Sequence, residues 1–581
     1  MIEAQPQALS VPADPEQGSA LRQGLLLFLI SMLAFMTLQI LPGTVTNEDG
    51  STRFGLRSRS FPLGDSPYHV RMAYLYRTGA IAEAGQNFHW MSDSIWSDAF
   101  ANKEFLFHLY LVPFTLGADD ISDTTALIWG GKVASAVLMS LLMVTVFAAL
   151  RCFGVRHAWA YVPLVIALGG WVFCSRAEEL RAWPMGVICS LTGWVMMARN
   201  RRIELALVAA IFTLAYSAVH FLVILWAVRT VLMLVWGPEK GATRRSEFKA
   251  NLWLLAAILG GILLGALLHP NRDGFMRMWA VTYLLVPAGI LKGAARETAF
   301  DLFAALGISP GYSTEEASRM LLGMEFLPLA GTDLLVAGAA PILAPMLLTL
   351  LSLRLRHRPG REAVLAGGAA VLVLFMFLNS LRFAEIMGPF MALAVGLWLD
   401  SLFKSRRWHS IQRQRPRLPG LLKKAGAALA FLAATGVLCS LIAIKDPNLP
   451  VPWRDAALFM RDSAGDSRPK VFHTQCDVFP ALFFYAPNCD YLVGMDPNYM
   501  LAHDVGKSRL IWDVYYGKVE ESTLSRIQQL FKPDWLYVDA NVTPVFGRYC
   551  EEQVEKGTLE RIYKDAYYGH IAVYRVVKRG G

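Results

Sequence analysis

Apolar runs of about 18 or more residues recur along this 581-residue chain, and they restrict its fold more than any other feature. Each run is long enough to cross a bilayer core of roughly 30 Å as one helix. Helices satisfy their own backbone hydrogen bonds inside a bilayer, so the pattern predicts a polytopic α-helical membrane protein. We place about eleven spans, near residues 21–41, 124–150, 158–173, 183–198, 203–219, 221–236, 252–268, 334–353, 363–378, 384–399 and 425–444.

The lysines and arginines lie mainly in short segments between these spans. Hydrophobic residues make up 55% of the chain, charged residues 17%, and the formal net charge is +9. Segment 404–424 carries eight basic residues and no acidic one. Such loops stay in the cytoplasm and meet anionic lipid headgroups, so the charge reports topology and not a nucleic-acid partner. We expect a bacterial inner (cytoplasmic) membrane, a cytoplasmic N-terminus and an extracytoplasmic C-terminal domain. Lys132 and Arg229 fit less well, because they fall inside apolar stretches.

Three regions differ in composition. Residues 1–20 are polar and form a cytoplasmic leader. Residues 21–444 form the transmembrane domain, with a large first extracytoplasmic loop at 43–123. Residues 445–581 alternate short β-rich runs (470–473, 491–493, 535–538, 571–576) with helix-like segments (453–462, 479–485, 504–516, 523–531), which predicts a small α/β domain. Cys476 and Cys489 in this domain form either a bridge or two free thiols.

The first loop is the richest source of candidate site residues, and it contains the stretch Asp65-Ser66-Pro67-Tyr68-His69-Val70-Arg71. Transfer of a sugar from a phosphate-linked lipid requires a carboxylate to accept the proton of the acceptor, and cations or a metal to neutralise the leaving phosphate. An apolar groove must hold the lipid. The predicted topology supplies all three on one side of the membrane. The alternative role of Asp65 is a helix N-cap, because Asp-Ser-Pro opens a helix well.

The Asp65 stretch, the long first loop, the multi-span body and the α/β tail together resemble the GT-C superfamily of membrane glycosyltransferases. That superfamily includes protein O-mannosyltransferases, the oligosaccharyltransferase catalytic subunit and lipid A aminoarabinose transferase. The resemblance implies a polyprenyl-phosphate-linked sugar donor, transfer that usually inverts the anomeric centre, and Asp65 as the catalytic aspartate. The tail lacks the Trp-Trp-Asp-Tyr-Gly motif of oligosaccharyltransferases, and the loop lacks the paired Asp-Glu of O-mannosyltransferases.

Further charged residues near the predicted membrane boundary are candidates for donor phosphate binding or for a supporting role. Arginine suits phosphate through its planar donor fork. The alternatives are solvated loop surface and, for the clustered charges, pairing of arginine with glutamate. The phosphate-binding candidates are Arg71, Lys103, Arg176 and Arg181, and the supporting candidates are His69, Asp93, Asp98, Glu104, Glu178, Arg382 and Glu385.

The sequence therefore predicts a membrane glycosyltransferase that transfers a sugar from a polyprenyl-phosphate donor to an extracytoplasmic protein, lipid or polysaccharide, with Asp65 as general base. No cofactor is required by the pattern, and a divalent metal stays open because scattered histidines give no ligand spacing. Two other functions stay open. One is a lipid-linked sugar flippase, although no inverted repeat is evident. The other is an envelope scaffold without enzymatic activity.

Overall fold

The computed structural model describes residues 16–40, 42–46, 52–56, 64–81, 88–236, 243–282, 331–414 and 452–577 apart from 493 and 567–568, with scattered residues within 294–301 and 417–435. In these ranges, helices cover all the predicted spans except the one near 425–444, which lies mostly outside the described residues. Six helices are long and apolar enough to cross a membrane, and the number of crossings stays a prediction. The helices of this bundle are α1 (Glu16–Ile40), α5 (Thr124–Cys152), α6 (Leu164–Glu178), α7 (Trp183–Ala198), α8 (Arg202–Ala215), α9 (Phe221–Trp236), α10 (Arg244–Leu268), α15 (Gly331–Arg354), α16 (Arg361–Asn379) and α17 (Ala384–Phe403).

Small residues let the helices of this bundle approach closely. Gly261 and Gly265 of α10 face α8, and a Cβ at Gly261 would lie 2.2 Å from the carbonyl oxygen of Ala206. Between apolar helices in lipid, close backbone packing of this kind replaces the hydrophobic driving force available in water. An alanine at Gly261 would therefore push α8 and α10 apart.

The two basic residues inside apolar stretches both have polar partners. Lys132 of α5 is 3% exposed, and its ammonium donates to the backbone carbonyl of Gln39 near the end of α1 at 2.9 Å. Arg229 of α9 donates to the side chain of Asn251 in α10. Both cations therefore join neighbouring helices, which offsets the cost of placing charge inside the bundle.

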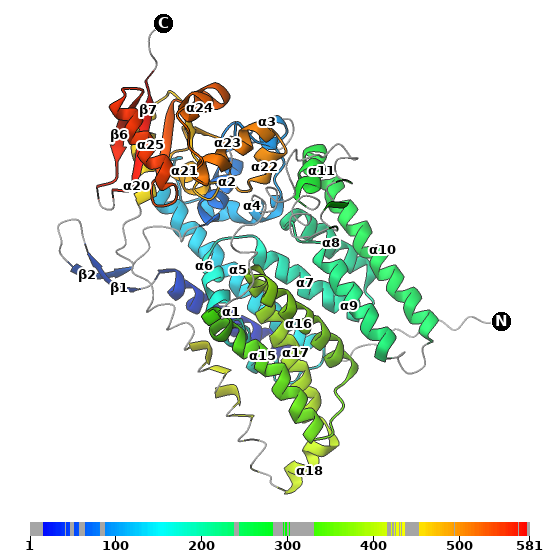
Figure 1. Cartoon of the computed structure of the whole chain (residues 1–581). Helices are drawn as coiled ribbons and strands as arrows, with labels where there is room; N and C mark the ends of the chain where they lie inside the picture. The colour runs from blue at the N-terminus through cyan, green and yellow to red at the C-terminus, as the bar shows by residue number, and fades with distance from the viewer. Residues whose placement is uncertain are drawn as a thin grey trace.

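The first loop and the C-terminal domain form a second layer at one end of the bundle (Figure 1). The short basic helix α18 (Arg406–Gln414) lies at the opposite end. The loop contributes β1 (Pro42–Thr46), β2 (Thr52–Leu56), α2 (Ser66–Thr78), α3 (Ile95–Asp98), α4 (Phe105–Leu111) and η1 (Val112–Thr115), and α11 (Arg272–Ala280) follows α10. Short 3-10 turns η2 (Ala158–Tyr161) and η5 (Leu381–Phe383) precede α6 and α17.

The C-terminal domain is the expected α/β unit, built on a five-stranded sheet in the order β4-β3-β5-β7-β6. Strands β3 and β4 run parallel to their neighbours, and β7 pairs antiparallel with β5 and β6. The predicted helix at 523–531 matches α24 at both ends, whereas β6 and α25 were not predicted. Its elements are α20 (Pro452–Ala464), β3 (Lys470–Phe472), α21 (Phe479–Tyr485), β4 (Asp490–Tyr491), α22 (Asn498–Leu501), α23 (Val505–Tyr515), α24 (Thr523–Phe531), β5 (Trp535–Asp539), α25 (Pro544–Glu555), β6 (Leu559–Lys564) and β7 (Ile571–Val576).

Loop residues 90–93 extend the β4 edge of this sheet. The amide of Tyr491 donates to the carbonyl of Trp90 at 3.0 Å, and the amides of Ser92 and Asp93 donate to Tyr491 and Leu492 at 3.0 and 2.9 Å. This pairing satisfies a sheet edge that would otherwise be open. The first loop and the tail are thus joined by backbone hydrogen bonds, although hundreds of residues separate them in the chain.

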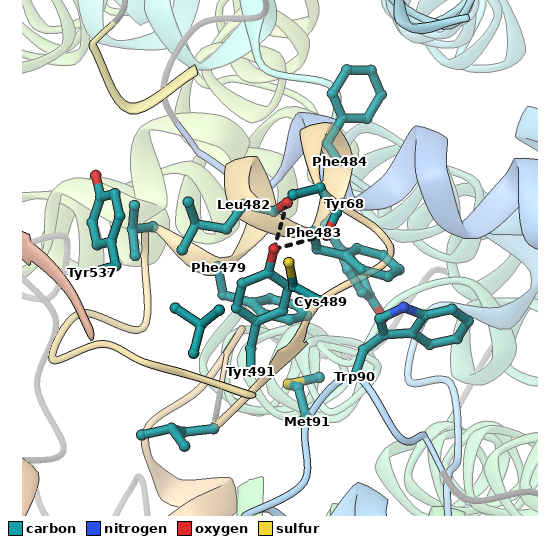
Figure 2. Packing of buried hydrophobic residues seen from close by; sticks show 14 of the residues in the cluster. Tyr68, Trp90, Met91, Phe479, Leu482, Phe483, Phe484, Cys489, Tyr491 and Tyr537 are labelled. Carbon is teal, nitrogen blue, oxygen red and sulfur yellow. Dashed lines mark hydrogen bonds between the residues drawn. The ribbon is translucent and has the colours of Figure 1, made fainter. Parts of the chain in front are cut away.

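The same two segments share one hydrophobic core, which also includes Leu127 and Leu138 of α5, and a second core lies within the membrane bundle. Figure 2 shows Tyr68, Trp90 and Met91 of the loop packed around α21 and β4 of the tail. The ring of Phe483 lies 6.0 Å from that of Tyr68 and 5.3 Å from that of Trp90. Buried aromatic pairs of this kind contribute about 0.5–1.5 kcal/mol beyond the area they bury. Cys489 lies in this core, and both it and Cys476 are free thiols.

Candidate functional site

Asp65 lies at the start of α2, where the loop layer meets the membrane bundle. Its backbone has helical angles (φ −78°, ψ −6°), and its side chain makes no hydrogen bond that caps α2. The carboxylate instead lies 3.4 Å from the guanidinium of Arg181, and its side chain is 28% exposed. Of the two roles considered for Asp65, the structure therefore gives no support to the N-cap.

The start of α2 is fixed against the segment that follows α6. The hydroxyl of Ser66 accepts the backbone N–H of Leu180 at 2.8 Å. Gly64 has φ +131°, and a Cβ there would lie 3.3 Å from the guanidinium of Arg181. A side chain at Gly64 would be strained and crowded at the same time. These contacts position the Asp65 carboxylate beside Arg181.

A charged cluster surrounds this position. Arg181 Nε forms an ion pair with Glu179 Oε2 at 2.7 Å, and Arg176 lies 3.3 Å from the same carboxylate. Arg176 also pairs with Glu385 at the start of α17. Glu385 is 3% exposed. The clustered arginines thus pair with carboxylates, which was the alternative to lipid-phosphate binding. The side chain of Arg176 is 14% exposed and that of Arg181 is 18% exposed, so both arginines also reach solvent at this boundary.

Lys103 and Asp496 bring a second group of charges close to Asp65. The ammonium of Lys103 lies 5.9 Å from the ring centre of Tyr499. Burial lowers the pKa of Lys103, but the negative charges of Glu104, Asp496 and Asp65 and the Tyr499 hydroxyl outweigh it, so the pKa is raised. Lys103 is therefore positively charged at neutral pH. Burial raises the pKa of Asp496, which accepts a hydrogen bond from the amide of Asn498 at 2.9 Å.

Arg382, on the turn before α17, belongs to the same neighbourhood. Its side chain hydrogen-bonds to Tyr216 at the end of α8, and its charge acts on Glu104 and Asp496. The structure thus brings together Asp65, Lys103, Glu104, Arg176, Arg181, Arg382 and Glu385 from the predicted set.

Below the first turn of α2, two histidines and a glutamate converge. His69 Nδ1 lies 2.8 Å from His108 Nε2 and 3.5 Å from Glu104 Oε2. Burial lowers the pKa of both histidines, as do neighbouring positive charges, so both are neutral at pH 7. Burial raises the pKa of Glu104. Among the described residues, this is the group of His, Cys, Asp and Glu side chains whose spacing fits a metal ion.

Two predicted residues, Arg71 and Asp93, lie in contacts that hold the second layer together. Arg71 is fully buried and donates to the carbonyls of Ile121 and Phe484. Asp93 pairs with Lys470 and Lys507 of the tail at 2.8 and 2.5 Å.

Asp98 and Glu178 lie at the margins of the layer. Asp98 is half exposed and lies 3.2 Å from His503 and 3.5 Å from Arg277. Glu178 is buried at the end of α6, where its carbonyl accepts from Gln39 at 2.8 Å. The roles predicted for these four residues stay predictions without a contact that favours them.

Sequence reasoning did not find Asp496, Tyr499 or Asn102. Asp496 lies in the segment Gly494-Met495-Asp496-Pro497, whose turn composition is visible in the sequence. Met495 adopts a positive φ of 64°, and the negative charge of the next residue, Asp496, acts on the ammonium of Lys103. The turn signal could have marked the segment, but its proximity to the first loop depends on the pairing of residues 90–93 with β4.

Comparison with solved structures gives similarity over almost the whole chain. The archaeal oligosaccharyltransferase AglB from Archaeoglobus fulgidus, solved with an inhibitory peptide and a dolichol-phosphate, matches with a TM-score of 0.55 at 12% identity, over 97% of this chain and 75% of that one. ArnT from Cupriavidus metallidurans, solved bound to undecaprenyl phosphate, matches with a TM-score of 0.54 at 13% identity, over 97% and 99%. No protein-family model and no curated protein matches the chain. The chain thus shares its fold with these two membrane proteins, which is the fold that the resemblance predicted.

Proposed function

We propose that this chain is a GT-C membrane glycosyltransferase that takes a sugar from a polyprenyl-phosphate donor and transfers it to an acceptor outside the cytoplasm. The fold supports the class, because the AglB and ArnT structures compared above hold a dolichol-phosphate and an undecaprenyl phosphate. One observation within the chain carries the proposal furthest. The Asp65 carboxylate does not cap its helix, and it lies at the junction of loop and bundle beside paired arginines.

Asp65 is the general base in this proposal. The acceptor hydroxyl or amide attacks the anomeric carbon, the bond from that carbon to the phosphate oxygen breaks, and the acceptor proton passes to the Asp65 carboxylate. A single displacement of this kind inverts the anomeric centre. Arg181 at 3.4 Å holds the carboxylate in position while the acceptor approaches.

Lys103 and Arg181 are the proposed ligands of the leaving lipid phosphate. Lys103 is positively charged and shares its surroundings with Asp65. Arg181 presents several donors, of which one pairs with Glu179. Both would offset the negative charge that develops as the phosphate departs. Arg176 and Arg382, each tied to a neighbouring helix, would hold Glu385 and Tyr216 in place around this site.

The orientation in the membrane follows from the charge pattern. Helix α18 carries Arg406, Arg407 and Arg413 at the end of the bundle away from the tail. We propose that this end faces the cytoplasm and that the site faces the opposite compartment, in a chain of about eleven crossings in a bacterial inner membrane.

Two measurements test the proposal. Purified chain in detergent is titrated with undecaprenyl phosphate, and binding should weaken about tenfold in Lys103→Met and in Arg181→Gln. Membranes that contain the chain are then supplied with radiolabelled undecaprenyl-phosphate sugars, and labelled acceptor should form with the wild type and not with Asp65→Asn.

Equal labelling by wild type and Asp65→Asn would contradict the role of Asp65. Movement of the intact donor across vesicles that contain the chain, with no break of the sugar–phosphate bond, would favour the flippase. The absence of both sugar transfer and donor binding would favour the scaffold without enzymatic activity.

A further inference from the structure

We propose that His69, Glu104 and His108 form a structural binding site for a divalent cation of the zinc class. The three residues come from two elements, α2 and the segment that begins α4. Their ligand atoms lie within 4.8 Å of one another, and all three side chains are at least nine-tenths buried. The proposal concerns metal binding and does not depend on the transfer reaction.

The first observation is the convergence of three electron-pair donors on one point. His69 Nδ1 is 2.8 Å from His108 Nε2 and 3.5 Å from Glu104 Oε2. Without a cation, one proton on His69 Nδ1 would have to serve both neighbours. Tetrahedral zinc with nitrogen at 2.0–2.1 Å places adjacent ligand atoms about 3.3 Å apart, which lies between the two distances seen here.

The second observation is a buried carboxylate oxygen that has no hydrogen-bond partner. Glu104 is 6% exposed, and its Oε2 atom accepts no hydrogen bond. An unsatisfied buried polar atom costs about 1–3 kcal/mol, and more when it is charged. Oε2 is also the atom that faces His69. A divalent cation at this point would satisfy the carboxylate and both imidazoles at once.

The surroundings of His108 fit a ligand histidine. His108 Nδ1 lies 2.9 Å from the amide oxygen of Asn102, and that oxygen also accepts the backbone N–H of Glu104. The amide nitrogen of Asn102 donates to Tyr76 at 2.9 Å, which fixes the orientation of the amide. The Asn102 amide nitrogen also lies 2.7 Å from His108 Nδ1, so this side-chain amide holds the Nδ1 edge of the ring while Nε2 faces His69. A hydrogen bond from the second ring nitrogen to an oxygen is the usual support of a metal-binding histidine.

The set of two nitrogens and one oxygen indicates the class of cation. Imidazole favours zinc and similar transition metals, whereas magnesium and calcium prefer oxygen ligands alone. A water molecule would complete four-coordination. The site lies one helical turn below Asp65, because the amide of His69 donates to the carbonyl of Asp65 at 3.1 Å. The cation would thus hold the first turn of α2 onto α4, and through it the Asp65 carboxylate.

Metal content tests the proposal directly. Tag-free full-length protein is purified in detergent, incubated with zinc, passed into metal-free buffer and analysed by plasma mass spectrometry. The wild type should retain about one zinc ion per chain. Glu104→Gln and His108→Ala should each weaken zinc binding about 100-fold in competition with a chromophoric chelator, and Asn102→Leu about tenfold. His89→Ala is the matched control, because His89 lies in the same loop, is half exposed and should keep full zinc binding.

Cobalt in place of zinc gives a second measurement that needs the wild type alone. This measurement tests the proposal even if a variant does not fold. A four-coordinate site with nitrogen and oxygen ligands should give visible d–d absorption. A wild type that retains no zinc and shows no cobalt absorption overturns the proposal, and so do ligand variants that bind zinc as the wild type does. Sugar transfer by a wild-type chain that binds neither zinc nor cobalt would count against this site only, whereas zinc binding without sugar transfer would count against the proposed function only.

Discussion

Asp65 and Asp93 come from the same loop, and both were candidates for the site, yet the structure gives them opposite surroundings. Asp93 is 2% exposed and lies between the ammonium groups of Lys470 and Lys507 in the tail. Asp65 is 28% exposed and has one cationic neighbour at 3.4 Å, Arg181. Asp93 is saturated by close partners, whereas Asp65 can still reach an incoming molecule.

The difference follows from the pairing of the loop with the tail. Residues 90–93 add to the edge of β4, and this pairing carries Asp93 to the lysines of β3 and α23. Asp65 lies at the start of α2, where the second layer meets the membrane helices. An aspartate that is fully neutralised stabilises the protein, and one with an open side can accept a proton from a substrate. The two residues should therefore respond in opposite ways to the same substitution.

The largest expected effect is the loss of activity in Asp65→Asn. A general base contributes about 10²–10⁴-fold to the rate, so sugar transfer in membranes should fall by that range. Stability should change by less than about 1 kcal/mol, because the lost pair with Arg181 is partly exposed. Transfer is measured with radiolabelled undecaprenyl-phosphate sugars, and Asp98→Asn is the control. An Asp65→Asn protein that transfers sugar at the wild-type rate would contradict the catalytic role that distinguishes Asp65 from Asp93.

Asp93→Asn should show the reverse pattern. Removal of this carboxylate leaves two lysines without their shared partner, at a cost of about 2 kcal/mol after allowance for their partial exposure. The thermal midpoint of the detergent-purified chain should fall by several degrees, about 2–4 °C for each kcal/mol. The intrinsic transfer rate per folded molecule should stay near the wild-type value. An unchanged midpoint would mean that the pairing with the tail contributes nothing to stability.

Arg71→Met sharpens the same comparison for a cation. Arg71 donates to two backbone carbonyls, Ile121 and Phe484, so its loss should cost about 2–3 kcal/mol in stability. The dissociation constant for undecaprenyl phosphate should remain within about twofold of the wild type, whereas Lys103→Met should raise it about tenfold. Calorimetry and a lipid titration on the same samples give both values. If Arg71→Met and Lys103→Met weaken lipid binding equally, Arg71 would be a ligand of the lipid phosphate, as the sequence predicted.

Sequence patterns located the elements far better than they located the site. Period and turn signals matched α24 to the residue, because its apolar face and flanking residues are local features. Strand β6 was missed, since among the described strands it lies at the sheet edge beside β7, and three of its six residues, in Leu-Glu-Arg-Ile-Tyr-Lys, are charged. Asp65 was chosen from its motif and its predicted side of the membrane, and its role as general base stays a prediction. The contrast with Asp93 and the electrostatic interaction of Lys103 with Asp496 could not be predicted, because both depend on which strand edge the loop joins.

The smallest expected effect is a pH dependence confined to the pair with the tail. Burial alone would raise the pKa of Asp93, but Lys470 and Lys507 outweigh it and hold the pKa below its usual 3.8. A carboxylate with a depressed folded pKa contributes stability that is fully present above its unfolded pKa and is lost as the pH falls through the folded value. The difference in thermal midpoint between the wild type and Asp93→Asn should therefore be constant from pH 7 to about pH 5 and shrink below pH 3.8. A difference that shrinks already near pH 6 would mean that a histidine, and not Asp93, governs the contact between loop and tail.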